Sequence, residues 1–186
     1  MRSQQLVSRH EARPQWLATF PLLAAALYRR ADMIDVGMVL GPYRLLRPIG
    51  RGGMGQVFAA VHERMGQEVA LKLLTPESAE DSQLVARFIQ EARALAQLEH
   101  PGIVRVFQCD RLDDGRVYVA MERLDGISLR DFLRQHGRRP PFPAAMAIAR
   151  QLAIAMVEVH RKGIVHRDLK PENVFLCPDE SVEQGY

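Results

Sequence analysis

The stretch His166-Arg167-Asp168-Leu169-Lys170-Pro171-Glu172-Asn173 decides how this sequence is interpreted. It has the form H-R-D-x-x-x-x-N, in which a carboxylate that can accept a hydroxyl proton precedes an amide oxygen that can ligate Mg²⁺. Between them stands Lys170, whose compact ammonium suits contact with a phosphate. The alternative interpretation is a charged turn between a helix and a strand, with no chemical role.

A second informative stretch is Gly50-Arg51-Gly52-Gly53-Met54-Gly55-Gln56-Val57, with the glycine spacing G-x-G-x-x-G. Because glycine has no Cβ atom, backbone N–H groups of such a stretch can approach and cover a polyphosphate. Dinucleotide-binding turns share this spacing, but they open a helix and are followed by an acidic residue about 20 positions on. Here a β-rich run begins at Gln56 and Lys72 follows, which disfavours the dinucleotide interpretation. A glycine hairpin that only turns the chain is the remaining alternative.

Short β-rich runs broken by glycine predict five antiparallel strands, at residues 43–49, 56–62, 68–74, 104–111 and 117–122. Between the third and fourth strands, residues 81–98 predict a helix. One stripe of that helix carries Leu84, Phe88, Glu91, Leu95 and Leu98. The stripe predicts that Glu91 points inward, where an unpaired carboxylate is costly, and Lys72 on the third strand is its predicted partner.

The later part of the chain has a helical pattern. Residues 128–135 predict a helix capped by Ser128, residues 143–162 a longer helix closed by Gly163, and residues 174–176 a short strand. Residues 1–38 lie outside the motif series and are interpreted as an extension, poorly ordered or containing one short helix. Their apolar run at 16–28 resembles a signal peptide but lacks a convincing cleavage site, which disfavours secretion.

Composition excludes several classes of function. The chain has 186 residues, 47% of them apolar and 25% charged, as in soluble globular proteins. No stretch approaches the roughly 20 apolar residues that span a bilayer, so no membrane span is expected. The formal charge of +3 comes from basic residues spread along the chain, which predicts no nucleic-acid binding. Cys109 and Cys177 are too few for a disulfide framework, and a cytoplasmic location is the expectation.

Taken in order, the glycine-rich run, the segment Val69-Ala70-Leu71-Lys72 and the H-R-D-L-K-P-E-N run resemble the signatures of eukaryotic-type protein kinases. The lysine two residues after Asp168 is similar to the serine/threonine branch, and Gly-Arg-Gly-Gly-Met-Gly to its bacterial members. This resemblance implies an α+β, protein-kinase-like fold. It comprises a complete five-stranded amino-terminal lobe with one helix (39–122) and the first helices and catalytic loop of an incomplete carboxy-terminal lobe (123–186).

The resemblance also implies catalytic roles. Asp168 would accept the proton of the substrate hydroxyl, Lys170 would neutralise developing charge, and Asn173 would ligate Mg²⁺. Lys72 would position the phosphates, with Glu91 as its ion-pair partner. His166 resembles the structural histidine of the family rather than a base.

The same resemblance assigns an ATP site. In the segment Met121–Gly126 the backbone carbonyl of Glu122 and the amide of Leu124 would bind the adenine edge, next to Met121 as gatekeeper. Val57 and Ala70 above the base and Phe175 below it would form apolar walls. The residues assigned to the nucleotide are Ile49, Gly50, Gly52, Gly53, Gly55, Val57, Ala70, Lys72, Glu122, Leu124 and Phe175.

No Asp-Phe-Gly follows Asn173 in this sequence, so the resemblance implies a kinase truncated before that segment. By family, the expected activity is transfer of the γ-phosphate of ATP to protein Ser or Thr hydroxyls, with this chain inactive alone. The alternative is a catalytically dead nucleotide-binding or interaction fragment, and a small-molecule phosphotransferase is a third possibility. The expected partners are ATP, a protein substrate, and an intact kinase or the missing carboxy-terminal segment.

Overall fold

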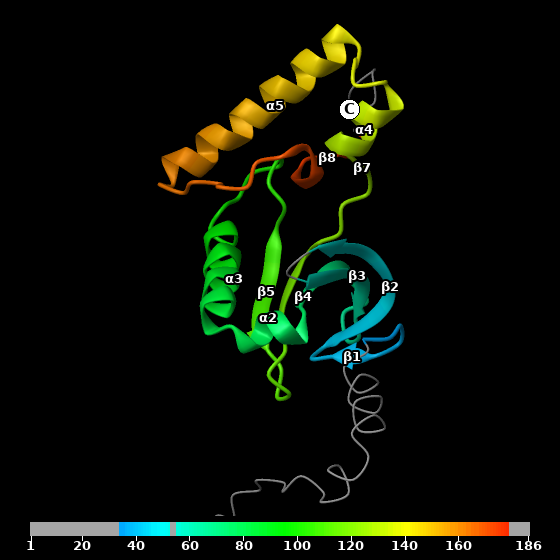
Figure 1. Ribbon diagram of the computed structural model, residues 1–186, viewed down its shortest axis with the longest axis vertical. Helices are drawn as coiled ribbons and strands as arrows, with labels where there is room; N and C mark the ends of the chain where they lie inside the picture. Colours follow the sequence, from blue (N-terminus) through cyan, green and yellow to red (C-terminus); the bar gives the residue numbers. More distant parts are fainter. Residues whose placement is uncertain (1–33, 53–54, 179–186) are drawn as a thin grey trace, which may run out of the picture. The chain divides into compact units, whose positions relative to one another are not determined.

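The structure is a computed structural model that describes residues 34–52 and 55–178 (Figure 1). The chain divides into the units Met1–Asp35 and Val36–Tyr186, and the fold below is that of the second unit. The expectation for residues 1–38 falls mostly outside the described residues. The boundaries inferred between extension and lobes stay predictions.

An antiparallel sheet of six strands forms the first part of the described chain. Its strands are β1 (Val39–Leu40), β2 (Tyr43–Gly52), β3 (Gly55–His62), β4 (Glu68–Leu74), β5 (Val106–Arg111) and β6 (Val117–Glu122). They lie in the order β1-β2-β3-β4-β6-β5. The five predicted strands are all present, and β1 is additional. Two residues are too few to show an alternating pattern, so β1 could not be recognised from sequence.

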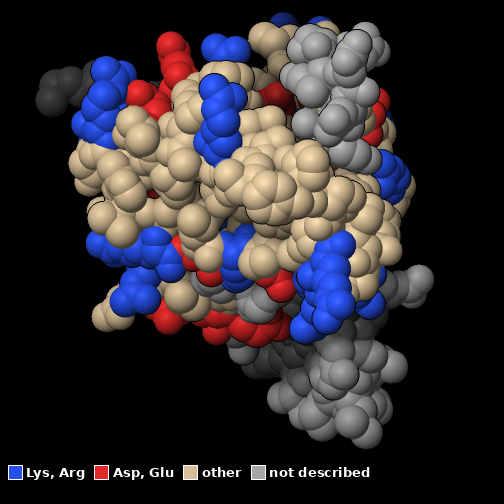
Figure 2. Space-filling model, turned by 90° about the horizontal axis from the view of Figure 1, so that it is seen from above, with Lys and Arg blue, Asp and Glu red and all other residues tan. Residues whose placement is uncertain are grey.

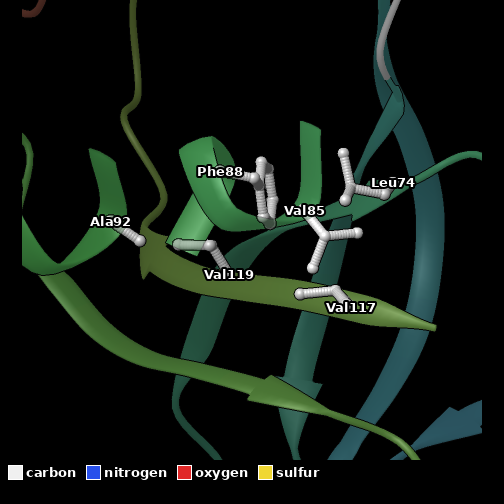
Figure 3. Close-up of a cluster of buried hydrophobic side chains, with 6 residues drawn as sticks. All are labelled: Leu74, Val85, Phe88, Ala92, Val117 and Val119. Carbon is white, nitrogen blue, oxygen red and sulfur yellow. The ribbon is translucent and has the colours of Figure 1, made fainter. Parts of the chain in front are cut away.

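Helix α3 (Ser82–Leu95) packs on this sheet, preceded by the short helix α2 (Pro76–Glu80). Asp81 caps α3, because its carboxylate accepts hydrogen bonds from the N–H groups of Gln83 and Leu84. The apolar cluster between α3 and the sheet, shown in Figure 3, consists of Leu74, Val85, Phe88, Ala92, Val117 and Val119.

The predicted inward stripe of α3 is wrong in part, because Leu84 and Leu95 are only half-buried and Glu91 is not buried at all. The buried residues of the helix are Val85, Phe88 and Ala92, whereas Glu91 is exposed. The helix therefore turns Val85 and Ala92 toward the sheet in place of Glu91. This rotation keeps a carboxylate in water instead of desolvating it, which is the lower-energy arrangement when no cation pairs with it.

The second part of the described chain contains helix α4 (Leu129–Gln135), helix α5 (Phe142–Arg161) and the 3₁₀ turn η2 (Pro171–Asn173). Strands β7 (Ile127–Ser128) and β8 (Phe175–Leu176) pair antiparallel as a separate two-stranded sheet. The predicted helices and the predicted short strand agree with α4, α5 and β8 to within one residue at each end. Ser128 is the cap of α4, as predicted, and its hydroxyl accepts a hydrogen bond from the N–H of Asp131.

Helix α5 exposes a broad apolar face. Ala155 and Val159 are buried, but Phe142, Met146, Ile154 and Val157 are exposed, Val157 to 66%. Figure 2, viewed from the end at which α5 lies in Figure 1, shows a wide surface of uncharged residues with charged side chains of both signs around its margin.

By length and composition alone α5 is also apolar enough to cross a membrane, which corrects the expectation that no stretch approaches this threshold. The criterion is weak evidence, because helices that pack in the cores of soluble proteins meet it as well.

Candidate functional site

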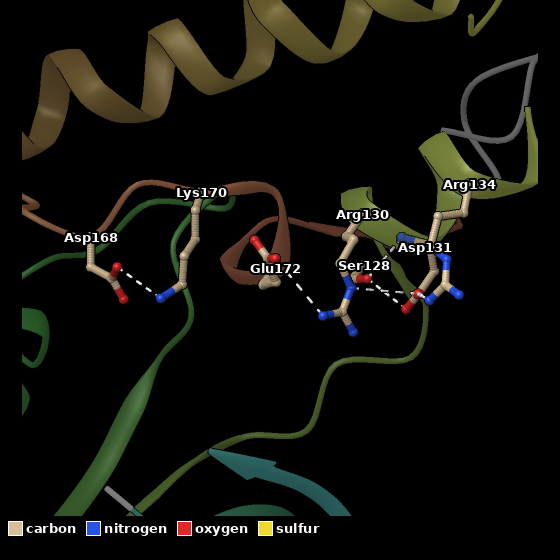
Figure 4. Close-up of polar contacts among 7 residues, drawn as sticks. All are labelled: Ser128, Arg130, Asp131, Arg134, Asp168, Lys170 and Glu172. Carbon is tan, nitrogen blue, oxygen red and sulfur yellow. Dashed lines mark hydrogen bonds and ion pairs between the residues drawn. The ribbon is translucent and has the colours of Figure 1, made fainter. Parts of the chain in front are cut away.

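The first group of site residues lies in the loop between α5 and β8, around Asp168 (Figure 4). The Lys170 ammonium lies 2.9 Å from one oxygen of the Asp168 carboxylate. The Asn173 amide donates a hydrogen bond of 2.9 Å to the other oxygen and one of 2.8 Å to the Asp168 carbonyl. The three functional residues that the H-R-D-x-x-x-x-N spacing predicted are therefore in direct contact.

These contacts stabilise the ionised form of Asp168. The hydrogen bond from Lys170, followed by that from Asn173, holds the pKa of the Asp168 carboxyl below its ordinary value. In return, the hydrogen bond to Asp168 raises the pKa of the Lys170 ammonium. Both side chains are about half exposed or more, so water screens the pair, and its charges remain accessible to an incoming ligand.

The backbone of the loop is bent sharply just before Asp168. Arg167 has a φ of 60°, in the left-handed region that a residue with a side chain seldom adopts. Across this bend the Asp168 N–H donates to the His166 carbonyl at 2.7 Å. Such strain is common where a side chain must be presented in a fixed direction, and here it precedes the carboxylate of the site.

Contacts that the sequence did not reveal tie this loop to helix α4. The Arg130 guanidinium lies 3.8 Å from the Glu172 carboxylate (Figure 4). The Leu129 N–H donates to the Val174 carbonyl at 2.7 Å. At Gly126, an added Cβ would lie 2.2 Å from the Leu176 carbonyl oxygen. Only glycine permits this approach, so Gly126 allows β7 and β8 to pair closely.

The second group of site residues lies on the large sheet. Gly50 and Gly52 are on β2 opposite Val57 and Gly55 of β3, while Gly53 lies outside the described residues. A Cβ at Gly55 would lie 2.1 Å from the Leu73 carbonyl oxygen, so a side chain is excluded there. The glycine at this position therefore serves strand packing directly. Contact of the Gly55 backbone with a phosphate is a separate prediction.

Lys72 lies in the middle of the same sheet. It faces Val57 of β3 and Val119 of β6 across its two neighbouring strands. Its ammonium lies over the ring of Phe88, 5.4 Å from the ring centroid. No ion pair joins Lys72 to Glu91 in the part of the chain that the structure describes, so the predicted pairing is absent from this conformation.

The segment predicted to bind adenine follows β6. Met121 pairs with Ala70 across β4 and β6, which places the predicted gatekeeper beside a predicted wall residue. Within the described residues the Leu124 N–H donates no hydrogen bond, while the Glu122 N–H donates to the Arg105 carbonyl at 2.8 Å. Ile49 and Phe175 are exposed, as residues that contact a ligand would be in its absence.

Arg123 in this segment has a structural partner that sequence reasoning missed. Its guanidinium lies 2.8 Å from the carboxylate of Glu68, the first residue of β4. Because Arg123 is half-buried and Glu68 begins the central strand β4, the ion pair ties the segment after β6 to the sheet. Residues separated so far in sequence give no spacing signal that could predict it.

The donor atoms around Asp168 suit a metal that is shared with phosphates. No cluster of three or more His, Cys, Asp or Glu side chains occurs within residues 34–52 and 55–178. Magnesium in phosphate-transfer sites is usually held by one or two protein oxygens together with phosphates and water. The Asn173 amide, whose nitrogen already donates to Asp168, leaves its oxygen for such a ligand.

Comparison with known proteins identifies the family. The model of the protein kinase domain matches residues 43–183. Serine/threonine-protein kinase PknD of Mycobacterium tuberculosis is 43% identical over 147 residues, which are 78% of this chain and 22% of PknD. Serine/threonine-protein kinase pkn2 of Myxococcus xanthus is 41% identical over 145 residues, which are 78% of this chain and 17% of pkn2.

A solved structure is similar as well. The crystal structure of the M. tuberculosis PknI kinase domain matches with a TM-score of 0.69 and 31% identity, covering 78% of this chain and 58% of that one. The chain belongs to the protein kinase family, among the bacterial serine/threonine kinases of eukaryotic type. It spans about a fifth of the length of the curated relatives that it matches.

Proposed function

We propose that this chain contributes the nucleotide site and catalytic loop of a cytoplasmic serine/threonine protein kinase, which transfers the γ-phosphate of ATP to protein hydroxyls. The observation that carries the proposal is the contact of Asp168 with both Lys170 and Asn173. It combines an ionised base, a cation and an amide oxygen on one exposed loop, which are the groups that phosphoryl transfer needs.

In this proposal the Asp168 carboxylate orients the substrate Ser or Thr hydroxyl and accepts its proton as the oxygen attacks phosphorus. The Lys170 ammonium, already beside Asp168, neutralises charge that develops on the transferred phosphoryl group. Asn173 would hold Mg²⁺, which when bound supplies further neutralisation of the phosphate oxygens. Lys72, whose ammonium lies over the Phe88 ring, binds phosphates from the sheet side.

The adenine base would lie between the walls named from the sequence. Ala70 and Met121 are neighbours on the sheet, and the Leu124 N–H has no partner within the described residues, so it can donate to the base. Phe175 offers an exposed aromatic face on the catalytic-loop side. An apolar slot with a few backbone hydrogen-bonding groups is the usual form of a purine site.

Two measurements on the purified chain test the proposal. MgATP should raise its melting temperature, and Lys72→Met should remove most of that effect. Phosphate transfer to a generic protein substrate should be measured with the chain alone and after mixing with a polypeptide that supplies an Asp-Phe-Gly segment. Transfer that survives Asp168→Asn undiminished, or a melting temperature indifferent to MgATP, would refute the proposal.

A second candidate function, an interaction module without catalysis, is favoured by the exposed apolar face of α5. A large apolar surface of this kind usually contacts another protein segment. Mixing the chain with an intact serine/threonine kinase and measuring the complex by sedimentation tests it. Association that is lost in Val157→Asp but kept in Gln151→Asp, an exposed polar position of the same helix, supports this candidate. Absence of association rejects it.

A further inference from the structure

The ammonium of Lys72 has an aromatic partner in place of a carboxylate. It lies 5.4 Å from the centroid of the Phe88 ring, within the range at which a cation is attracted to the face of an aromatic ring. Glu91, three residues further along α3, is exposed and makes no ion pair with Lys72 in the described chain. The ring of Phe88 is the group that faces the cation in this conformation.

The position of the ring is fixed by packing. Phe88 is 6% exposed and belongs to the apolar cluster between α3 and the sheet (Figure 3). Val85 and Ala92 flank it on the helix, and Val119 lies on the strand that faces Lys72. A ring surrounded in this way has little rotational freedom, so its face is presented to Lys72 at no further cost in conformational entropy.

Lys72 has apolar neighbours across the sheet. It is half-buried in a row with Val57 and Val119, and these side chains offer its ammonium no hydrogen bond. A nearby negative potential stabilises an ammonium beside such neighbours. The face of an aromatic ring supplies that potential without itself requiring hydration.

We propose that Phe88 is a positioning residue that holds the Lys72 ammonium in the nucleotide-free chain and gives it up when phosphate binds. The proposal rests on the proposed function in that Lys72 contacts phosphate. The contact between Phe88 and Lys72 concerns the nucleotide-free chain only and does not depend on the proposed function. Because the ring and the phosphate compete for one cation, removing the ring should strengthen nucleotide binding.

The contact can be observed directly by NMR. Lys72, Lys162 and Lys170 are the three lysines of the sequence, so reductive ¹³C-methylation gives three lysine signals, and Lys72→Arg identifies the first. The Lys72 methyl protons should be displaced upfield by the ring current of Phe88. Phe88→Leu should abolish that displacement, whereas Phe88→Tyr, which keeps the ring, should retain it.

A matched control separates the contact from general loosening of the core. Phe132 is a buried phenylalanine of α4, 4% exposed, and Phe132→Leu makes the same chemical change in the other part of the described chain. It should leave the Lys72 signal in place. A Lys72 signal in the wild type without upfield displacement, or one that Phe88→Leu leaves unchanged, overturns the proposal. Neither result depends on nucleotide, so both are distinct from failure of the proposed function.

The competition is tested by affinity. Phe88→Leu should lower the Kd for MgATP by about two- to fivefold, the factor that corresponds to a solvent-accessible cation–π contact. Phe88→Tyr should leave the Kd within about twofold. If the Lys72 signal responds as expected but Phe88→Leu weakens nucleotide binding, the ring assists the phosphate contact, and the competing role of Phe88 is refuted.

Discussion

Leu71 and Leu73, on either side of Lys72, are completely buried in the large sheet, whereas Asp168 and Lys170 of the catalytic loop are exposed. The sheet holds its functional lysine by apolar packing, and its strand partners lie in fixed register. The loop holds its functional aspartate by local polar contacts within six residues of chain. The two parts of the proposed site are therefore stabilised by different interactions, which respond differently to mutation and to pH.

The largest expected effect compares the same substitution in both parts. Leu71→Ala removes a fully buried side chain and should lower the free energy of unfolding by about 2–5 kcal/mol. Leu169→Ala, at an exposed position beside Asp168, should change it by less than about 0.5 kcal/mol. Urea denaturation followed by circular dichroism measures both. Similar losses in the two variants would show that the loop packs as tightly as the sheet.

The next prediction concerns a substitution that should change phosphate transfer but not the stability of the fold. Asp168→Asn should lower phosphate transfer by about 10²- to 10⁴-fold, because it removes the base that accepts the hydroxyl proton. The urea midpoint should barely move, since the side chain is exposed. Transfer is measured with labelled ATP in the mixture that contains an Asp-Phe-Gly segment. Glu172→Gln, an exposed carboxylate on the same loop, is the matched control and should retain most of the transfer.

The large sheet and the catalytic loop differ in how much of their structure could be predicted from the sequence. Five strands, α5 and the Ser128 cap followed from local patterns, and so did the grouping of Asp168, Lys170 and Asn173 in one loop, because these residues are close in sequence; their mutual contacts came from the structure. Local sequence patterns could not decide whether Glu91 faces the sheet. The helix period allows either Glu91 or Ala92 to face the sheet, and the choice depends on whether Lys72 pairs with a carboxylate.

The contacts that were missed all join distant segments. Arg130 meets Glu172, Arg123 meets Glu68, and Gly126 lies against the Leu176 carbonyl. Each of these residues has an ordinary local interpretation as a surface charge or a turn glycine. Their partners are determined by tertiary packing, and contacts between distant segments leave no regular spacing in a single sequence.

A smaller effect is expected at the boundary of α4. Ser128→Ala removes the hydroxyl that caps the helix and bonds Asp131, and should lower the free energy of unfolding by about 1 kcal/mol. Ser82→Ala, at an exposed position in α3 where Asp81 is the cap, is the control and should have little effect. Denaturation curves of both variants give the comparison. Equal losses would mean that the hydroxyl of Ser128 does not cap α4.

The smallest effect is the dependence of the loop on pH. Asp168 has a lowered pKa, so its stabilising contribution is present above the unfolded-state pKa of about 3.9 and is lost as pH falls through the folded value. The Lys170 pKa is raised, so its contribution is present at lower pH and is lost as pH rises through that value. Both groups are exposed, and the change in stability should be slight.

NMR titration of the Asp168 carboxyl carbon detects the same coupling directly. The midpoint should lie below that of an ordinary aspartate and should rise in Lys170→Met, because the hydrogen bond from Lys170 is the main cause of the lowered pKa. Lys162→Met, which removes a lysine outside the loop, should leave the midpoint unchanged. A midpoint that is insensitive to Lys170 would show that the ion pair does not persist in solution.

The most direct test of the whole account is hydrogen–deuterium exchange of the chain with and without MgATP. If one nucleotide is held by both parts, MgATP should slow exchange in the strands that carry Gly50 to Val57 and, at the same concentration, in the loop from Asp168 to Asn173. Lys72→Met should remove both effects together. Protection confined to one of the two segments would contradict a shared nucleotide site.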